Sequence, residues 1–425
     1  KTQEVEILTL EDCLRIGIDN NLSLEGKRKE IQRSKYGVSE NRSKLLPQIN
    51  AIAGYSNNFD PPVSVTDGSS YGVPYNITQT LQHSANAGLE MQMPLFNQTL
   101  YTSMSIAKVM EEISRLSYGK AREDVILQIS KMYYLGQVTA EQIMLIKANI
   151  TRLEELRDIT QAFFDNGMSM EVDLKRVNIN LENLKVQYDN AQAMMKQQLN
   201  MLKYIMDYPA EKEIALTPVN TDSITTVALT GLSENIYELQ LSQSQVQLAE
   251  RQKKIIANGY IPSLSLTGSW RYAAYTDKGY HWFHSGPSNQ WFRSYGVGLT
   301  LRIPIFDGLD KTYKIKKAMI DIKNKRLAWE DARKNLQTQY LNAVNDLMNN
   351  QRNFKKQKDN YLLAEDVYAV TSDRYREGIA SMTEVLQDEM QMSEAQNNYI
   401  SAHYNYRVTN LMLLKLTGQI ESLVK

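Results

Sequence analysis

Long stretches of the chain carry apolar residues at three- and four-residue spacing and contain few helix breakers. Between Gly308 and Gly378 there is no glycine or proline, and residues 97–166 contain only two glycines and no proline. A continuous helix of about 69 residues would extend on the order of 100 Å, far beyond a typical globular helix. The apolar stripes are narrow and flanked by polar positions, which is typical of coiled-coil-like packing. The pattern predicts long helices at 97–166, 168–205, 308–377 and 379–417.

A second pattern, alternation of apolar and polar residues, interrupts the helices at 48–95 and 263–305. Each of these regions holds two alternating segments around a loop, so the chain is predicted to contain four such strands. Alternation over about ten residues matches a tilted membrane strand, although half-buried hairpins of a soluble sheet would alternate in the same way. No stretch reaches the roughly 18 apolar residues of a transmembrane helix, so any membrane crossing would use strands. Four strands cannot close a barrel around a channel, so several chains would have to share one. The predicted membrane-facing residues are Leu89, Met91, Met93, Leu264, Leu266, Trp270, Val297, Leu299 and Leu301.

The chain is internally duplicated. The sequence LPQI at 46–49 enters the first pair of strands and IPSL at 261–264 enters the second, while PLF at 94–96 and PIF at 304–306 leave them. The long helices end at matching turns, at Gly167 and Gly378. We therefore predict two repeats, 1–206 and 233–425, joined by a proline- and glycine-containing linker at 207–232.

Composition narrows the function. The 48 basic and 48 acidic residues balance, which argues against a nucleic-acid partner. Only four histidines and one cysteine are present, and the sequence contains no Ser-His-Asp grouping, phosphate loop or metal-spaced cluster. We therefore expect no enzymatic activity, no cofactor and no metal site. Cys13 lies inside a helical pattern and is expected to be a small buried residue.

The duplicated motifs resemble the TolC-like outer membrane efflux family. The opening LTLEDCL at 8–14, the strand entries and exits, and the twin glycine turns all resemble that family in order. The resemblance implies a mainly α protein with a small β part: long helices forming a periplasmic tube, and four strands per chain contributed to a shared trimeric transmembrane β-barrel. It also implies a homotrimer in the outer membrane of a Gram-negative bacterium, with most of the mass in the periplasm. Such a duct is passive, contacts outer-membrane lipid, and docks to a periplasmic adaptor protein and an inner-membrane transporter.

The resemblance also suggests a gate near the second turn. Glu384 and Gln387 match two inward carboxylate positions of the family, and Asp388 is adjacent. Gln387 is neutral and departs from the family's pair of carboxylates, so only the ring at Glu384 would be acidic at these two positions, and a solvated helix face is the alternative. Tyr375 and Asp173 match a pair that ties neighbouring helices shut, while Ala380 replaces the basic residue that supports that pair.

The two turns themselves are candidates for adaptor docking, because small residues at a turn let a partner helix approach closely. A purely structural turn is the alternative reading. The candidate docking residues are Gly167, Met168, Ser169, Gly378, Ile379 and Ala380. A soluble coiled-coil scaffold would also explain the long helices. It would not explain two apolar-faced strand pairs at matching places in both halves.

Overall fold

The computed structural model describes residues 5–79, 81–219, 231–276 and 291–424, which form two compact units. The helical unit comprises Lys1–Ile31, Ile113–Gln243 and Leu327–Lys425, and the sheet unit comprises Gln32–Glu112 and Ser244–Arg326. Each unit takes segments from both sequence repeats, so neither unit coincides with one repeat. Residues 220–230 of the predicted linker and 277–290 between the last two strands lie outside the described residues.

Four helices account for most of the described chain. They are α3 (Gln98–Asp165), α4 (Glu171–Met206), α6 (Asp310–Arg376) and α7 (Met382–Leu416), against predicted ranges of 97–166, 168–205, 308–377 and 379–417. The shorter helices are α1 (Leu10–Asn20), α2 (Leu22–Ser43) and α5 (Tyr237–Asn258), with 3-10 turns η1 (Ser69–Tyr71) and η2 (Ile420–Val424). Among the described residues, none of the helices combines the length and apolarity required to cross a membrane.

The helical unit is built on a large apolar core. Thr9 and Asp12 form a capping box that starts α1, and the buried side of this helix carries Cys13 and Leu14, both fully buried. Tyr133 of α3 lies in the same core, and its hydroxyl donates to the carbonyl of Leu8 at 3.1 Å. Leu8 ends the strand β1 (Glu6–Leu8), which pairs in parallel with β6 (Ile214–Leu216). Core packing thus joins the start of the chain to the middle of α3.

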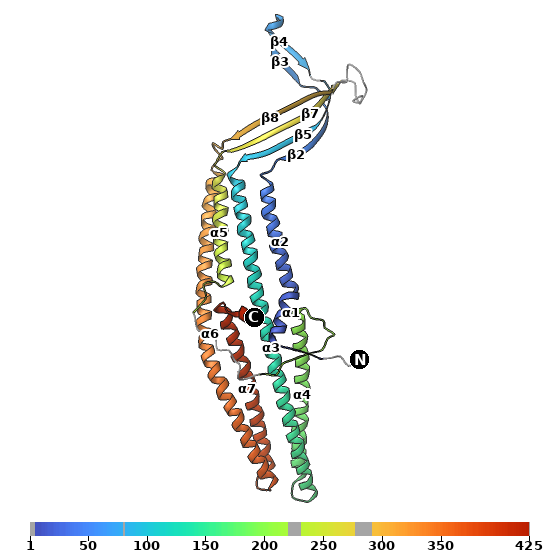
Figure 1. Ribbon diagram of the computed structural model, residues 1–425, viewed down its shortest axis with the longest axis vertical. Helices are drawn as coiled ribbons and strands as arrows, with labels where there is room; N and C mark the ends of the chain where they lie inside the picture. The colour runs from blue at the N-terminus through green and yellow to red at the C-terminus, as the bar shows by residue number, and fades with distance from the viewer. Residues whose placement is uncertain (1–4, 80, 220–230, 277–290, 425) are drawn as a thin grey trace. The chain divides into compact units, whose positions relative to one another are not determined.

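The sheet unit contains a four-stranded antiparallel sheet in the order β2-β5-β7-β8 (Figure 1). Its strands are β2 (Gln48–Asn57), β5 (His83–Phe96), β7 (Ser263–Thr276) and β8 (Trp291–Arg302). A separate hairpin of β3 (Val63–Asp67) and β4 (Tyr75–Gln79) lies between β2 and β5 in sequence. The first repeat supplies β2 and β5 and the second supplies β7 and β8, so the duplicated hairpins meet along the β5–β7 pairing.

Candidate functional site: the paired helical turns and the two-faced sheet

The two long helical hairpins of the helical unit end in turns with the same hydrogen bonding. Gly167 has φ of 71° and Gly378 has φ of 75°, a left-handed conformation that glycine adopts without strain. The amide of Met168 donates to the Phe163 carbonyl at 2.8 Å, and that of Ile379 donates to the Arg374 carbonyl at 2.8 Å. These six-to-one bonds define a Schellman motif at both helix ends. The two sequence repeats therefore fold into turns of the same geometry at Gly167 and Gly378.

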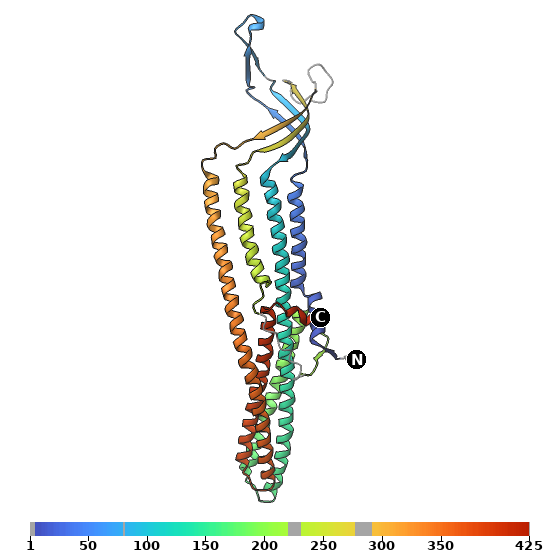
Figure 2. The same ribbon diagram turned by 60° about the vertical axis from the view of Figure 1, so that its left-hand side comes forward.

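Both turns lie at the same end of the helical unit (Figures 1 and 2). Residues of the two turns together line an open hollow of about 750 Å³, which includes Met168, Asp173, Tyr375 and Gly378. A polar bridge crosses it, because the Arg176 guanidinium of α4 lies 3.3 Å from the Asp173 carboxylate and donates to Thr383 of α7 at 3.1 Å. The structure thus brings most of the predicted gate and docking residues into one region.

Four of the predicted docking residues are exposed at this end: Gly167, Met168, Gly378 and Ile379. The side chains of Met168 and Ile379 are 68% and 63% exposed, a high value for apolar residues. Ser169 is half-buried. Ala380 is only 9% exposed and belongs to the apolar cluster beneath the turn, so its methyl group packs inside the chain. The exposed surface of the turns therefore includes only four of the six predicted docking residues.

Glu384 helps to start α7. Its carboxylate accepts from the Ser381 amide at 2.8 Å, and its own amide donates to the Ser381 hydroxyl at 3.3 Å, which completes a capping box. The hydrogen bond from the Ser381 backbone lowers the pKa of Glu384 below its ordinary value. Gln387 is exposed and Asp388 is half-buried on the following turn. Glu384 is thus an exposed, ionised carboxylate held at a helix start.

Tyr375 has a different partner in this chain from the one the resemblance implies. Its hydroxyl donates to the Thr160 hydroxyl of α3 at 3.2 Å, and its ring centroid lies 5.7 Å from that of Phe163. The side chain is only 6% exposed. Asp173 instead lies beside Arg176, a residue that sequence analysis did not select. Arg176 is three residues after Asp173, the helical spacing of an ion pair, and this spacing was the available signal.

Sequence analysis also missed a column of buried polar residues along α7. Glu389, Gln396 and His403 follow one another at seven-residue spacing and are 4%, 4% and 0% exposed. The Asn149 amide of α3 donates to Gln396 Oε1 at 2.7 Å, and Gln396 Nε2 donates back to Asn149 Oδ1 at 3.4 Å. Burial raises the pKa of Glu389 above its ordinary value. This column, called the polar column below, links α7 to α3 inside the helical unit.

Strand pairing in the sheet unit places all nine predicted membrane-facing residues on one face. Directly paired residues of antiparallel strands point to the same side, and residues two apart along a strand also share a side. The pairs are Leu264 with Leu301, Leu266 with Leu299 and Met93, and Trp270 with Leu89, while Met91 and Val297 both pair with Gly268. Val297 and Leu299 are 79% and 67% exposed. The sheet therefore presents an apolar face that the chain leaves uncovered.

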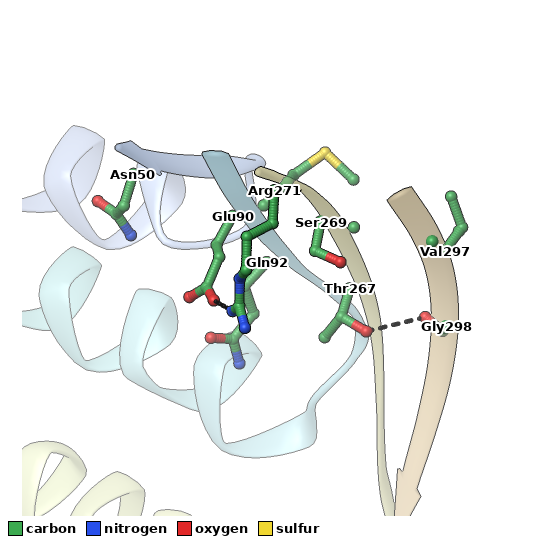
Figure 3. A pocket seen from close by; sticks show the side chains of 11 residues that line it. Asn50, Glu90, Gln92, Thr267, Ser269, Arg271, Val297 and Gly298 are labelled. Atoms are coloured by element: carbon green, nitrogen blue, oxygen red, sulfur yellow. Dashed lines mark hydrogen bonds and ion pairs between the residues drawn. The ribbon is translucent and has the colours of Figure 1, made fainter. Parts of the chain in front are cut away.

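The opposite face of the sheet is polar (Figure 3). Arg271 of β7 donates to the Glu90 carboxylate of β5, and the Thr267 hydroxyl donates to the Gly298 carbonyl at 3.3 Å. Asn50 and Gln92 line the same open depression, whose volume is about 510 Å³. Within the described ranges, no three His, Cys, Asp or Glu side chains are grouped so as to hold a metal ion. This face is suited to water and ions rather than to a tightly bound ligand.

Comparison with known proteins agrees with this geometry. The outer membrane protein TolC of Vibrio cholerae is 21% identical over 399 residues, which cover 90% of this chain and 84% of that protein. The toluene efflux pump outer membrane protein TtgC of Pseudomonas putida is 23% identical over 433 residues, covering 96% and 82%. The solved structure of the MtrE outer membrane channel of Neisseria gonorrhoeae has a TM-score of 0.76 at 19% identity, covering 96% and 88%. CusC has a TM-score of 0.80 at 16% identity, covering 96% and 91%.

The fold of the chain is therefore that of the outer membrane channels, with long helices and a small strand contribution. The sequence pattern described as outer membrane efflux protein matches residues 16–206 and again 229–419, one match in each repeat. Since these matches together span most of the 425 residues, the chain belongs to the outer membrane efflux protein family.

Proposed function

We propose that three copies of this chain assemble into the passive exit duct of a tripartite efflux or type I secretion system. As a family member the chain is an outer membrane protein and not an enzyme. The finer statements, on the trimer, the adaptor and the gate, are supported by particular surfaces. The single observation that carries the proposal is the uncovered apolar face of the four-stranded sheet, with its polar opposite face.

An open four-stranded sheet cannot lie in lipid alone. The edge strands β2 and β8 have unpaired outer sides in the described sheet order, and unpaired backbone groups are costly in hydrocarbon. Pairing of β8 with β2 of the next copy would satisfy both edges and close the sheet. The apolar face would then contact lipid and the polar face would line the channel.

The helices carry a matching signal for self-association. On α4, exposed apolar residues recur at seven- or eight-residue spacing, and on α6 they recur at or near multiples of seven. Such stripes form the seams of coiled coils when a second helix covers them. In a closed ring, helices of the neighbouring copies would cover these stripes. The residues are Val172, Ile179, Val186, Met194 and Met201 on α4, and Leu341, Met348, Leu362, Leu363 and Val370 on α6.

The paired turns would face the adaptor protein, because a surface of glycines and exposed apolar side chains lets a partner helix approach closely. A Cβ added to Gly167 or Gly378 would meet no atom of this chain within 4 Å, so the space above each turn is open. Glu384 from three copies would form a ring of negative charge that favours cations. Gln387 and Asp388 would lie one turn further along the same helix, and Tyr375 and Asp173 would hold the helices at this level. The inner-membrane transporter supplies the energy.

The first test is native mass spectrometry of protein extracted from outer membranes in mild detergent. We expect a trimer that precipitates when detergent is removed. A monomer that stays in solution without detergent would refute the duct and favour the alternative, a soluble coiled-coil scaffold. For the gate, Glu384→Gln keeps a side chain able to complete the capping box and removes only the charge. In planar bilayers this variant should lose cation preference, and an unchanged preference would remove Glu384 from the gate.

A further inference from the structure

Charge is distributed unevenly between the two units, although the whole chain is neutral. The segments of the sheet unit contain nineteen Lys and Arg against eleven Asp and Glu, so the helical unit carries the compensating acidic excess. Most of the excess is in the second repeat. Residues 310–326 of α6 contain seven basic and two acidic residues. The matching segment of the first repeat, residues 98–112 of α3, contains one basic and two acidic residues. The basic excess is therefore a feature of α6 and not of the fold.

The basic residues gather where helices meet strands. Tyr260, between α5 and β7, shares a hydrogen bond of 3.2 Å with Thr312 of α6, and the Lys311 ammonium lies 5.1 Å from the centre of its ring. These contacts place the end of α5 beside the start of α6, at the same level along the helix axes. Within about 10 Å of this level along the helices lie four lysines, called the junction lysines: Lys253, Lys254, Lys316 and Lys317.

No carboxylate of the described chain forms an ion pair with the junction lysines, in contrast to their neighbours. Lys311 pairs with Asp307 at 2.9 Å and Lys314 pairs with Asp310 at 2.7 Å. Lys254, Lys316 and Lys317 are exposed and Lys253 is half-buried. Lys316 and Lys317 lie beyond the first turn of α6, so the helix dipole gives no stabilisation of their charges either. Helix stability therefore does not explain Lys316 and Lys317.

Apolar side chains surround the same level. Ile305 and Phe306, between β8 and α6, are 94% and 80% exposed, and Tyr313 is 63% exposed. The Lys316 ammonium lies 5.5 Å from the centre of the Tyr313 ring. Exposed aliphatic and aromatic groups beside unpaired ammonium groups are characteristic of a membrane interface, where the former enter the acyl boundary and the latter meet phosphates.

From this combination we infer that the junction lysines bind anionic phospholipid headgroups of the leaflet that faces the helices. The inference rests on the proposed function, because it requires the sheet to lie in the membrane. Each lysine close to an anionic surface contributes roughly a fivefold preference, and salt screens the attraction over about 10 Å. The charge asymmetry between the repeats gives each copy one lipid-binding edge, formed by α5 and α6.

The experiment is a lipid titration of the detergent-solubilised protein by native mass spectrometry, with phosphatidylglycerol and phosphatidylcholine of identical acyl chains. The variant Lys316→Gln/Lys317→Gln removes two junction lysines. The control Lys355→Gln/Lys356→Gln removes two exposed lysines of α6 that lie about 60 Å further along the helix. We expect the preference of wild type and control for phosphatidylglycerol to exceed that of the junction variant by about 25-fold, because the variant lacks two of the four lysines. High salt should abolish the preference in all three.

Equal preference in the junction variant and the wild type would overturn the inference. It would also be overturned if the variant changed ion selectivity in bilayers without changing lipid preference, because the lysines would then line the channel. Tighter binding of soluble acidic peptidoglycan fragments than of phosphatidylglycerol would overturn it in favour of the cell wall. A detergent-dependent trimer without lipid preference defeats the inference and leaves the duct intact, whereas a detergent-independent monomer defeats the duct itself.

Discussion

The reciprocal amide pair of Asn149 and Gln396 gives the sharpest test of the polar column. Asn149 is 1% exposed and Gln396 is 4% exposed, so water cannot replace either partner. Gln396→Leu would remove the acceptor of the 2.7 Å hydrogen bond and leave the Asn149 amide without a partner at this position. An unsatisfied buried polar group costs about 1–3 kcal/mol. We expect the free energy of unfolding of the folded chain to fall by this amount.

The double variant Asn149→Leu/Gln396→Leu should recover most of that loss. Replacing both partners by apolar groups removes the unsatisfied amide, and such exchanges are often neutral or stabilising. Arg152, which also donates to Asn149, keeps its ion pair with Glu365 at 3.0 Å. Thermal unfolding in detergent and hydrogen exchange of the α7 amides would report both effects. The control Gln391→Leu alters an exposed glutamine of α7 and should change stability by only a few tenths of a kcal/mol.

The reasoning fails if the double variant is as unstable as the sum of the two single variants. That result would mean that the two side chains contribute independently and that their hydrogen bonds carry no coupling energy. In a second informative outcome, the double variant recovers its stability but α3 and α7 pack in a different register, and cross-linking would detect that change of register. It would show that the amide pair selects one helix alignment, as buried polar residues do in coiled coils.

Three further predictions address other parts of the chain. Ser381→Ala removes the hydroxyl cap of α7 and should destabilise the helix start by about 1 kcal/mol, seen as faster hydrogen exchange within its first turn. Burial raises the pKa of Glu123 from 4.5 to about 7, so the folded state binds this proton more tightly than the unfolded state. The contribution of Glu123 to stability is therefore largest below pH 4.5 and declines as the pH rises toward 7. The Tm of the wild type minus the Tm of Glu123→Gln should decline over the same pH range. A constant difference would contradict the reasoning. Leu299→Arg places a charge on the apolar face of the sheet and should make the free energy of membrane assembly less favourable by about 2–4 kcal/mol. Thr300→Arg, on the polar face, should be tolerated. Equal effects of the two variants would contradict the assigned faces.

Much of the fold follows from simple periodicities. The absence of glycine and proline between Gly308 and Gly378 was enough to predict α6, because nothing else in the segment interrupts helical hydrogen bonding. Alternation in the strands fixed which residues share a face, since a strand has only two faces and register preserves them. The location of the chain in the outer membrane and its membership of the efflux family were predicted correctly from the duplicated motifs.

Other features had no local signal. The pairing of β1 with β6 joins three-residue segments that are about two hundred residues apart, and such short strands leave no periodic pattern. The β3–β4 hairpin was not distinguished within the region 48–95. The polar column was missed for a physical reason: a polar residue on a helix usually faces water, and nothing near Glu389 or His403 in the sequence marks either side chain as buried. Only tertiary packing reveals that their seven-residue spacing coincides with the buried stripe.

The partner of Tyr375 could not be predicted, because Thr160, which accepts its hydrogen bond, belongs to another helix, α3. The sequence does not indicate which of several polar groups on neighbouring helices will form such a contact. Arg176, in contrast, lies three residues after Asp173 on α4, and this spacing could have indicated their ion pair. The gate and docking roles of these residues stay predictions, and the conductance and mass measurements above test them.

The burial of Cys13 makes this chain a convenient starting point for site-directed labelling. It is the only cysteine in the sequence, its side chain is fully buried, and burial raises the pKa of its thiol to about 12. Thiol reagents attack the thiolate, so the native residue should remain unmodified at neutral pH. A cysteine introduced at exposed Ile379 would then be the sole reactive thiol of each copy. Spin or fluorescent labels attached there would measure the distances between turns in the proposed assembly, and any change in those distances, without prior removal of a native cysteine.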